Sequence, residues 1–149
     1  MSGGVFVDTN ILVYAHDQDA GVKGERARAA LDRLWQSRTG CLSVQVLQEF
    51  LAITTGKLKA AVTPASAREV VRVYAAWVKV PTSPDIVLRA SEIAESTRLS
   101  VWAGLIVAAA EACGAAELYS EDLNEGQVIA GIRVVNPLKQ EGAVPDAPG

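Results

Sequence analysis

Hydrophobic residues in this chain occur in two alternating patterns: short continuous runs, and stretches in which they have a helical spacing. The first run, Val5-Phe6-Val7, places three β-forming residues in succession without alternation, which is typical of a strand buried on both faces of a parallel sheet. The apolar residues that follow, from Ile11 onward, have a helical spacing. Because the two patterns keep alternating, they predict an α/β fold.

The same reasoning defines the remaining elements. We expect a three-layer α/β/α sandwich with a central short parallel sheet, whose strand order these patterns do not define. Two helices begin with a hydroxyl residue before proline, at Thr63-Pro64 and Ser83-Pro84, a common helix start. The expected strands are residues 5–7, 41–43, 117–120 and 132–135, with a connection at 121–131; the expected helices are residues 11–16, 23–38, 44–55, 65–78, 85–98 and 101–113.

The chain has no internal repeat and no break in composition before its last residues. We therefore predict one domain over residues 1–138. Residues 139–149 combine Gly, Pro and charged residues without periodicity, which predicts a flexible tail.

Composition narrows the class of protein. With 14 basic and 17 acidic residues the net charge is −3, which argues against broad, nonspecific binding of nucleic acid. Cys41 and Cys113 are too few and too far apart in the sequence for a disulfide framework or a zinc cluster, so we expect small buried hydrophobic residues in a reducing compartment. The N-terminus has no signal pattern, and the longest apolar run, residues 101–110, is too short to span a bilayer. These features predict a cytoplasmic protein without a membrane segment.

Three acidic residues follow elements that end at one edge of the expected sheet. Asp8 follows the first strand, Glu49 lies two turns into the helix after the second, and Asp122 follows the strand that ends at Ser120. Taken singly, these residues are most simply a helix cap, a solvated helix residue and a turn residue. Their convergence at the carboxyl ends of parallel strands favours a site for Mg²⁺ or Mn²⁺, because crowded carboxylates repel one another without a cation. Such an ion polarises a phosphodiester and activates a water molecule.

Four stretches together resemble PIN domains and, within that superfamily, the VapC toxins of bacterial toxin–antitoxin pairs. They are residues 7–15, 43–50, 100–110 and 118–124, in the order and spacing of the family. The resemblance implies a Mg²⁺- or Mn²⁺-dependent endoribonuclease that cleaves structured RNA such as tRNA or ribosomal RNA. It also implies a homodimer and inhibition by a cognate VapB-like antitoxin.

The family's four acidic positions transfer to this chain one by one. Asp8 matches the first position, Glu49 the second and Asp122 the fourth. Asn10 and Ser120 match polar positions that support the site. The resemblance therefore implies metal binding by the three carboxylates, with Asn10 and Ser120 assisting catalysis.

The third acidic position is occupied by Ala103. Two explanations fit: a deliberate inactivating substitution, or a natural domain that binds RNA or a protein partner without cutting. The three intact acidic positions favour the first. Glu111 is a poor replacement, because it lies eight residues, or about 12 Å, further along the same helix. We predict weak metal binding and little or no RNA cleavage.

Other polar residues have simpler explanations. The single histidine, His16, is expected to end a short helix, because metal-activated water needs no histidine. Lys57 and Lys59, just beyond the Glu49 helix, are weak candidates for contacts with RNA phosphates. The motifs of nucleotide-binding α/β enzymes and of Ser-His-Asp hydrolases are missing. Arginines 26, 28, 33 and 38 are expected mostly on a solvated helix face.

Overall fold

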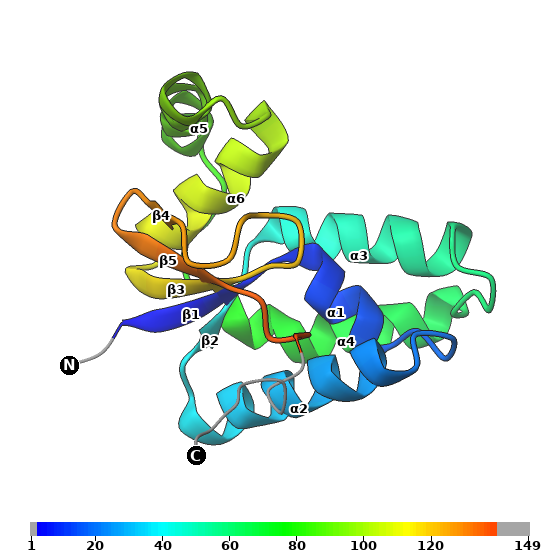
Figure 1. Ribbon diagram of the computed structural model, residues 1–149. Helices are drawn as coiled ribbons and strands as arrows, with labels where there is room; N and C mark the ends of the chain where they lie inside the picture. The colour runs from blue at the N-terminus through cyan, green and yellow to red at the C-terminus, as the bar shows by residue number, and fades with distance from the viewer. Residues whose placement is uncertain (1–2, 140–149) are drawn as a thin grey trace, which may run out of the picture.

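A five-stranded, mostly parallel sheet forms the centre of the computed structural model, which describes residues 3–139 (Figure 1). The strand order is β2-β1-β3-β5-β4. All neighbouring strands are parallel except β4, which pairs antiparallel with β5 at the sheet edge. The strands are β1 (Gly4–Val7), β2 (Gly40–Cys41), β3 (Ala115–Tyr119), β4 (Val128–Ile129) and β5 (Ile132–Val135).

Helices cover both faces of the sheet, which confirms the predicted three-layer sandwich. Figure 1 shows α5 and α6 on one side and α2 on the other, while α1, α3 and α4 group beyond the carboxyl end of β1. The helices are α1 (Thr9–Ala15), α2 (Val22–Ser37), α3 (Val44–Gly56), α4 (Pro64–Tyr74), α5 (Pro84–Thr97) and α6 (Val101–Ala112), with a short 3-10 helix η1 (Ala75–Trp77). The predicted helix starts at Thr63-Pro64 and Ser83-Pro84 are confirmed, since each hydroxyl accepts a hydrogen bond from a backbone N–H of the first turn.

Two expectations were wrong in detail. Residues 121–131 are not merely a connection, because they contain β4; the turn from β4 to β5 passes through Ala130 and Gly131, both with positive φ, as in tight hairpins. A two-residue strand is too short to show alternation. The helix expected over residues 65–78 ends at Tyr74 and tightens into η1, whose Trp77 packs against Gly40; a Cβ at Gly40 would lie 2.7 Å from that indole. The predicted tail beyond Lys139 lies outside the described residues.

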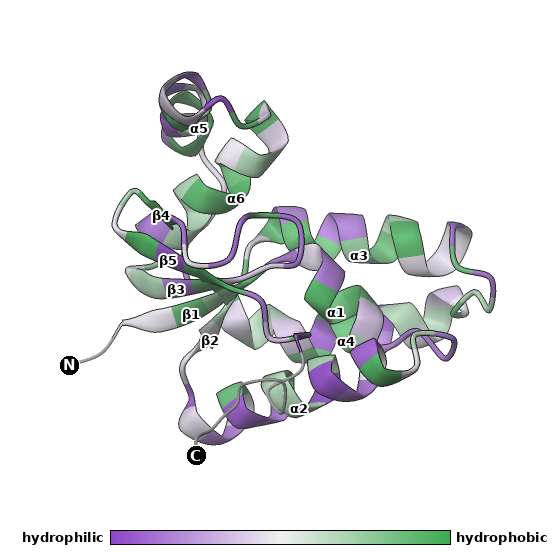
Figure 2. Cartoon of the chain, in the orientation of Figure 1, coloured by the Kyte–Doolittle hydropathy of each residue, from purple (hydrophilic) through white to green (hydrophobic). Residues whose placement is uncertain are grey.

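Hydrophobic residues fill the space between the sheet and the helices (Figure 2). Phe6, Leu118 and Val134 are fully buried on adjacent strands, and Phe50 is buried on α3. Helix α6 packs closely on α5, because Gly104 lets the backbone of Ala90 approach; a Cβ at position 104 would lie 2.5 Å from the Ala90 carbonyl oxygen.

The two cysteines are neighbours in space. Cys41 is buried, as expected, but Cys113 is only partly buried. A hydrogen bond between the two thiols raises the pKa of Cys41, which burial raises further, and lowers the pKa of Cys113. Their proximity was invisible in the sequence because it depends on the packing of α6 against the sheet.

Among residues 3–139, no single helix combines the length and hydrophobicity needed to cross a membrane; α5 and α6 reach that measure only as a pair, which is bent by 116°.

Candidate active site

Asp8 occupies the carboxyl end of β1 and is also the N-cap of α1. One carboxylate oxygen, Oδ1, accepts a hydrogen bond from the backbone N–H of Thr9 at 2.7 Å. The other, Oδ2, accepts one from the Ser120 hydroxyl at 2.9 Å. Asp8 therefore caps a helix and faces the end of β3 at the same time.

Burial is the main cause of an unusual pKa at Asp8. It raises the pKa of this carboxyl from 3.8 to about 6, against the opposing effect of the hydrogen bonds from Ser120 and Thr9. The nearby charges of Asp122 and Glu49 raise the pKa further. The Asp8 carboxyl therefore lies within the electrostatic reach of Glu49 and Asp122.

Glu49 is held in place by neighbours and is not a free, solvated helix residue. Ser43 caps α3 and so starts the helix that carries it. The Thr9 hydroxyl donates to Glu49 Oε1 at 2.5 Å, and the Gln45 side-chain amide donates to Oε2 at 3.2 Å. The second carboxylate is thereby directed toward the carboxyl end of β1.

The buried hydroxyl of Ser120 joins the third carboxylate segment to Asp8. While it donates to Asp8, its oxygen accepts hydrogen bonds from the backbone N–H groups of Asp122 at 3.1 Å and Leu123 at 3.4 Å. The Asn10 Oδ1 atom accepts from the backbone N–H of Glu121 at 3.4 Å. Ser120 and Asn10 thus organise the turn that presents Asp122.

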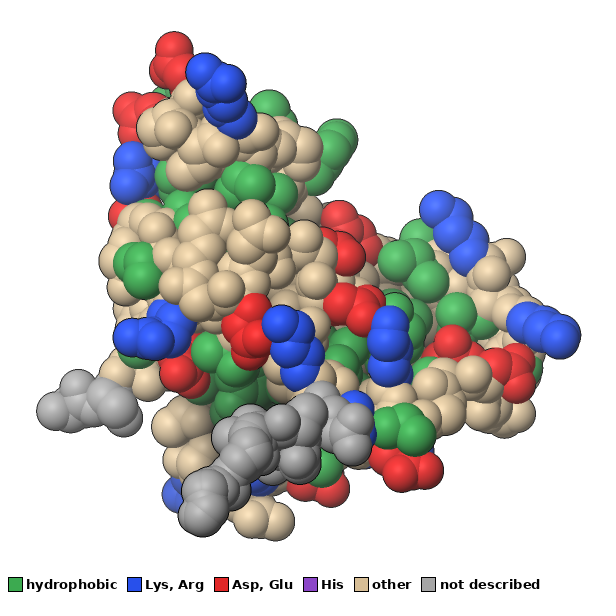
Figure 3. All heavy atoms as spheres, viewed as in Figure 1, with side chains coloured by type: hydrophobic (Ala, Val, Ile, Leu, Met, Phe, Trp, Pro, Cys, Tyr) green, Lys and Arg blue, Asp and Glu red, His purple; other side chains and the backbone are tan. Residues whose placement is uncertain are grey.

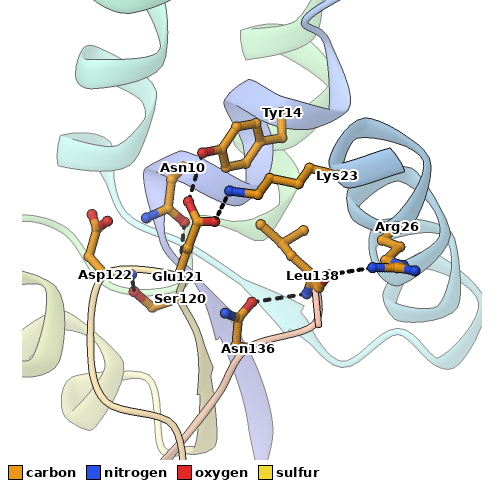
Figure 4. Close-up of polar contacts among 9 residues, drawn as sticks. All are labelled: Asn10, Tyr14, Lys23, Arg26, Ser120, Glu121, Asp122, Asn136 and Leu138. Carbon is orange, nitrogen blue, oxygen red and sulfur yellow. Dashed lines mark hydrogen bonds and ion pairs between the residues drawn. The ribbon is translucent and has the colours of Figure 1, made fainter. Parts of the chain in front are cut away.

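Glu121 and Asp122 are adjacent in sequence but have different surroundings. Figure 4 shows Glu121 directed toward Tyr14 and Lys23, whereas Asp122 lies apart from both. The Tyr14 hydroxyl donates to Glu121 Oε1 at 2.7 Å, and Lys23 forms an ion pair with Oε2. Partial burial raises the pKa of Glu121, but the hydrogen bonds from Lys23 and Tyr14 outweigh it and hold that pKa below its usual value.

Asp8, Glu49 and Asp122 together line two pockets, with volumes of about 430 and 560 Å³. Both volumes lie in the usual range of ligand sites. We call the first the Trp102 pocket and the second the Lys57 pocket. Figure 3 shows acidic side chains in the hollow between the α5–α6 pair and α3. The Trp102 pocket is also lined by Gln45, residues 98–100, Trp102, Ala103, Ile106 and Leu123, and the Lys57 pocket by Thr9, Asn10, Val13, Tyr14, Asp17, residues 52–53, Lys57 and Leu58.

Ala103 lies on the wall of the Trp102 pocket that faces the three carboxylates. Ser100 caps α6 by accepting a hydrogen bond from the Ala103 backbone N–H at 3.0 Å, which places position 103 in the first turn of the helix. Glu111 does not take its place: it forms a two-point ion pair with Arg89, with N–O distances of 2.8 and 3.0 Å. Position 103 therefore contributes a methyl group to the wall of this pocket.

The donor set fits a hydrated divalent cation. Within residues 3–139, no three acidic, histidine or cysteine side chains are close enough to form a direct metal cluster. Mg²⁺, however, commonly takes one or two carboxylates and keeps several waters, and Asp8 and Asp122 face the same pockets. The Asn10 Nδ2 atom is buried, and no group in the described part of the chain pairs with it. It offers a hydrogen-bond donor to water or to a substrate oxygen beside these carboxylates.

Of the remaining residues considered from the sequence, one lysine lines a pocket and the others lie elsewhere. Lys57 lines the Lys57 pocket, whereas Lys59 lines neither pocket. His16 ends α1, as expected, and packs edge-on against Phe50. Arg26 donates to the Leu138 carbonyl oxygen at 3.0 Å and so has a structural contact (Figure 4). Sequence reasoning did not assign a role in the site to Thr9, Tyr14, Lys23, Gln45, Arg98, Trp102 or Glu121, because their contacts depend on tertiary packing.

Comparisons with known proteins agree with the fold. The family model described as PIN domain matches residues 5–126. A toxin–antitoxin complex from Klebsiella pneumoniae contains a similar fold, with 19% identity and a TM-score of 0.65 over 91% of this chain and 98% of that one. Mycobacterium tuberculosis VapC20, a sarcin–ricin loop cleaving toxin, is 20% identical, with a TM-score of 0.59 over 87% of this chain and 99% of that one. VapBC2 from Rickettsia felis, bound to a promoter DNA fragment, is 17% identical, with a TM-score of 0.55 over 87% of this chain and 96% of that one. No curated protein matches the chain.

Proposed function

Because the chain belongs to the PIN domain family, we propose that it is a VapC-type endoribonuclease dependent on Mg²⁺ or Mn²⁺, with a nuclease site impaired by Ala103. The observation that carries this proposal is the position of Ala103. It lines the same pocket as Asp8, Glu49 and Asp122, so the one departure from the family's acidic set falls at the site itself. A departure elsewhere in the fold would have no such consequence.

In this proposal, some residues of the site would bind the metal ion and others would orient those residues. Asp8 and Asp122 would hold the metal ion, with Glu49 beside them; when bound, the ion polarises a phosphodiester and activates water. Ser120 orients Asp8 through its 2.9 Å hydrogen bond, and Thr9 orients Glu49. The unpaired Asn10 amide would donate to a phosphate oxygen or to the attacking water. Because position 103 carries a methyl group, this chain would offer the ion one carboxylate fewer than the family's acidic set.

Structured RNA and an antitoxin are the partners we propose. A similar fold occurs in a Klebsiella pneumoniae toxin–antitoxin complex and in a toxin that cleaves the sarcin–ricin loop. By analogy, this chain would act on tRNA or ribosomal RNA in the cytoplasm as a homodimer. A cognate VapB-like antitoxin would neutralise it by covering the acidic pockets.

The test is to restore the carboxylate with Ala103→Asp. We expect RNA cleavage in Mg²⁺ or Mn²⁺ to increase by about 100-fold, the usual effect of one electrostatic group at an active site, and Mg²⁺ affinity to increase in calorimetric titration. EDTA should abolish the cleavage. Ala112→Asp is the matched control, because it adds the same charge to the same helix at an exposed position outside both pockets.

The second candidate function is a PIN-like module that binds RNA or a protein without cleaving it. Ala103 and the lack of a direct metal cluster within residues 3–139 favour it. Equal cleavage and equal Mg²⁺ affinity for the wild-type chain and Ala103→Asp would contradict the nuclease proposal and leave this one.

A further inference from the structure

Trp102 is a large aromatic residue exposed at the edge of the candidate active site. Its relative exposure is 68%, against 3% for Trp77. Trp35 is partly buried and stacks on Tyr74 and Trp77. Trp102 therefore differs from the other two tryptophans, which belong to one packed cluster.

The surroundings of Trp102 combine polar and apolar side chains. It lines the pocket with the polar residues Gln45, Arg98 and Ser100 and with the apolar residues Leu99, Ile106 and Leu123. The Gln45 amide donates to the Trp102 carbonyl oxygen at 3.4 Å and also to Glu49 at 3.2 Å. The backbone of Trp102 is thus linked through one side chain to a carboxylate of the site. An exposed aromatic ring beside a basic side chain is the combination that binds single-stranded nucleic acid, because the ring stacks on a base while the charge attracts the phosphates.

Two basic residues lie on opposite sides of the shared carboxylates. Arg98 lines the Trp102 pocket and Lys57 lines the Lys57 pocket, and Asp8, Glu49 and Asp122 line both. Both basic side chains are exposed, and within residues 3–139 neither forms a salt bridge. A polyanion that crosses the carboxylates, neutralised there by a cation, would meet a positive charge before and after the site.

We propose that Trp102 stacks against a base of single-stranded RNA while Arg98 contacts an adjacent phosphate and Lys57 contacts a phosphate beyond the carboxylates. The inference rests on the proposed function, since the bound strand is its substrate. It adds a residue that recognises RNA by base stacking in the Trp102 pocket. Structured RNA would then be bound at an unpaired loop, where a base is free to stack.

The experiment compares two oligomers that differ only in their bases. A fluorescein-labelled oligouridine and an abasic ribose-phosphate oligomer of the same length are titrated with the full chain in Mg²⁺, and binding is followed by fluorescence anisotropy. Wild-type protein is suitable because Ala103 limits cleavage. Trp102→Ala should weaken binding of the oligouridine by roughly 10-fold or more and leave binding of the abasic oligomer unchanged. Trp102→Phe should retain most of the affinity, whereas Trp102→Leu should behave like Trp102→Ala.

Arg98→Gln should weaken binding of both oligomers and reduce the salt dependence of binding by about one charge. Arg38→Gln is the matched control. Arg38 and Arg98 both cap helix C-termini in the left-handed conformation, with φ of 61° and 63°, but Arg38 lies outside both pockets. The control should change neither affinity.

Each alternative has a distinct result. An equal effect of Trp102→Ala on both oligomers, or no effect on either, overturns base stacking. A change of sedimentation mass in Trp102→Ala without selective loss of oligouridine binding assigns Trp102 to contact with a second copy and also overturns it. Cleavage by Ala103→Asp with unaltered binding in Trp102→Ala would refute this inference but keep the nuclease function. Selective loss of oligouridine binding in Trp102→Ala, together with no cleavage by Ala103→Asp, would support base stacking and refute the nuclease function.

Discussion

Two groups of carboxylates lie side by side at the end of β3 and have opposite electrostatic surroundings. Glu121 receives hydrogen bonds from Lys23 and Tyr14, and its pKa is lowered. Asp8 is partly buried near two other acidic residues, and its pKa is raised to about 6. One residue further along the chain, Asp122 belongs to the second group although Glu121 belongs to the first (Figure 4).

The difference indicates which carboxylates need a cation from outside the protein. The chain provides Lys23 for Glu121 and Arg89 for Glu111. Within residues 3–139 it provides no salt-bridge partner for the three acidic residues that line the pockets. Crowded, unpaired carboxylates cost stability, and a divalent ion at the site offsets that cost. Three predictions test this contrast.

Asp8→Asn should have the largest effect, and its direction depends on pH. Because the folded protein holds a proton on Asp8 up to about pH 6, the stability contributed by neutral Asp8 is present at low pH and is lost as the pH rises from about 4 to 6. Asparagine stays neutral and still caps α1. Without metal, the variant should therefore gain about 3 kcal/mol on the wild type between about pH 4 and pH 8.

Urea denaturation in EDTA at both pH values measures this difference. Adding Mg²⁺ at pH 8 should stabilise the wild type more than Asp8→Asn. Parallel pH profiles for the two proteins would show that Asp8 is not destabilised by its surroundings.

Glu121→Gln should show the opposite sign with a smaller size. The pKa of Glu121 is lowered, so its stabilising contribution is present above the unfolded pKa and is lost as the pH falls through the folded one. We expect the variant to be less stable than the wild type by about 1 kcal/mol at neutral pH, the size of one hydrogen bond, and the difference to shrink in acid. Tyr14→Phe removes one of the two partners and should give part of the same loss. A gain in stability at neutral pH would contradict the contrast.

Glu111→Gln should have the smallest effect. The hydrogen bond from Arg89 lowers the pKa of Glu111, although partial burial opposes it, and both side chains are more than a third exposed. Solvent screening leaves little net stabilisation in such a pair. The slight loss of melting temperature should vanish in about 1 M salt, where the Debye length is about 3 Å. A loss that persists at high salt would point to packing between α5 and α6 instead.

Most elements of the fold could be predicted from local pattern. The run Val5-Phe6-Val7 and the capped starts at Thr63 and Ser83 were enough to locate a strand and two helices within a residue or two. The two-residue strand β4 was missed, because it contains too few positions for any periodicity. Strand order was also beyond local reasoning, since it depends on which buried faces pack together.

Some features of the candidate site could also be predicted from the sequence, and others could not. Chain order alone suggested that Asp8, Glu49 and Asp122 converge, because parallel strands end at a common edge. Ala103 was identified by its place in a motif and then found on the pocket wall. The exposure of Trp102, the different surroundings of Glu121 and Asp122, and the links from Thr9 and Gln45 to Glu49 were decided only by tertiary packing. Periodicity along a chain encodes which residues are buried, whereas contacts between side chains far apart in sequence arise only when the sheet and helices come together.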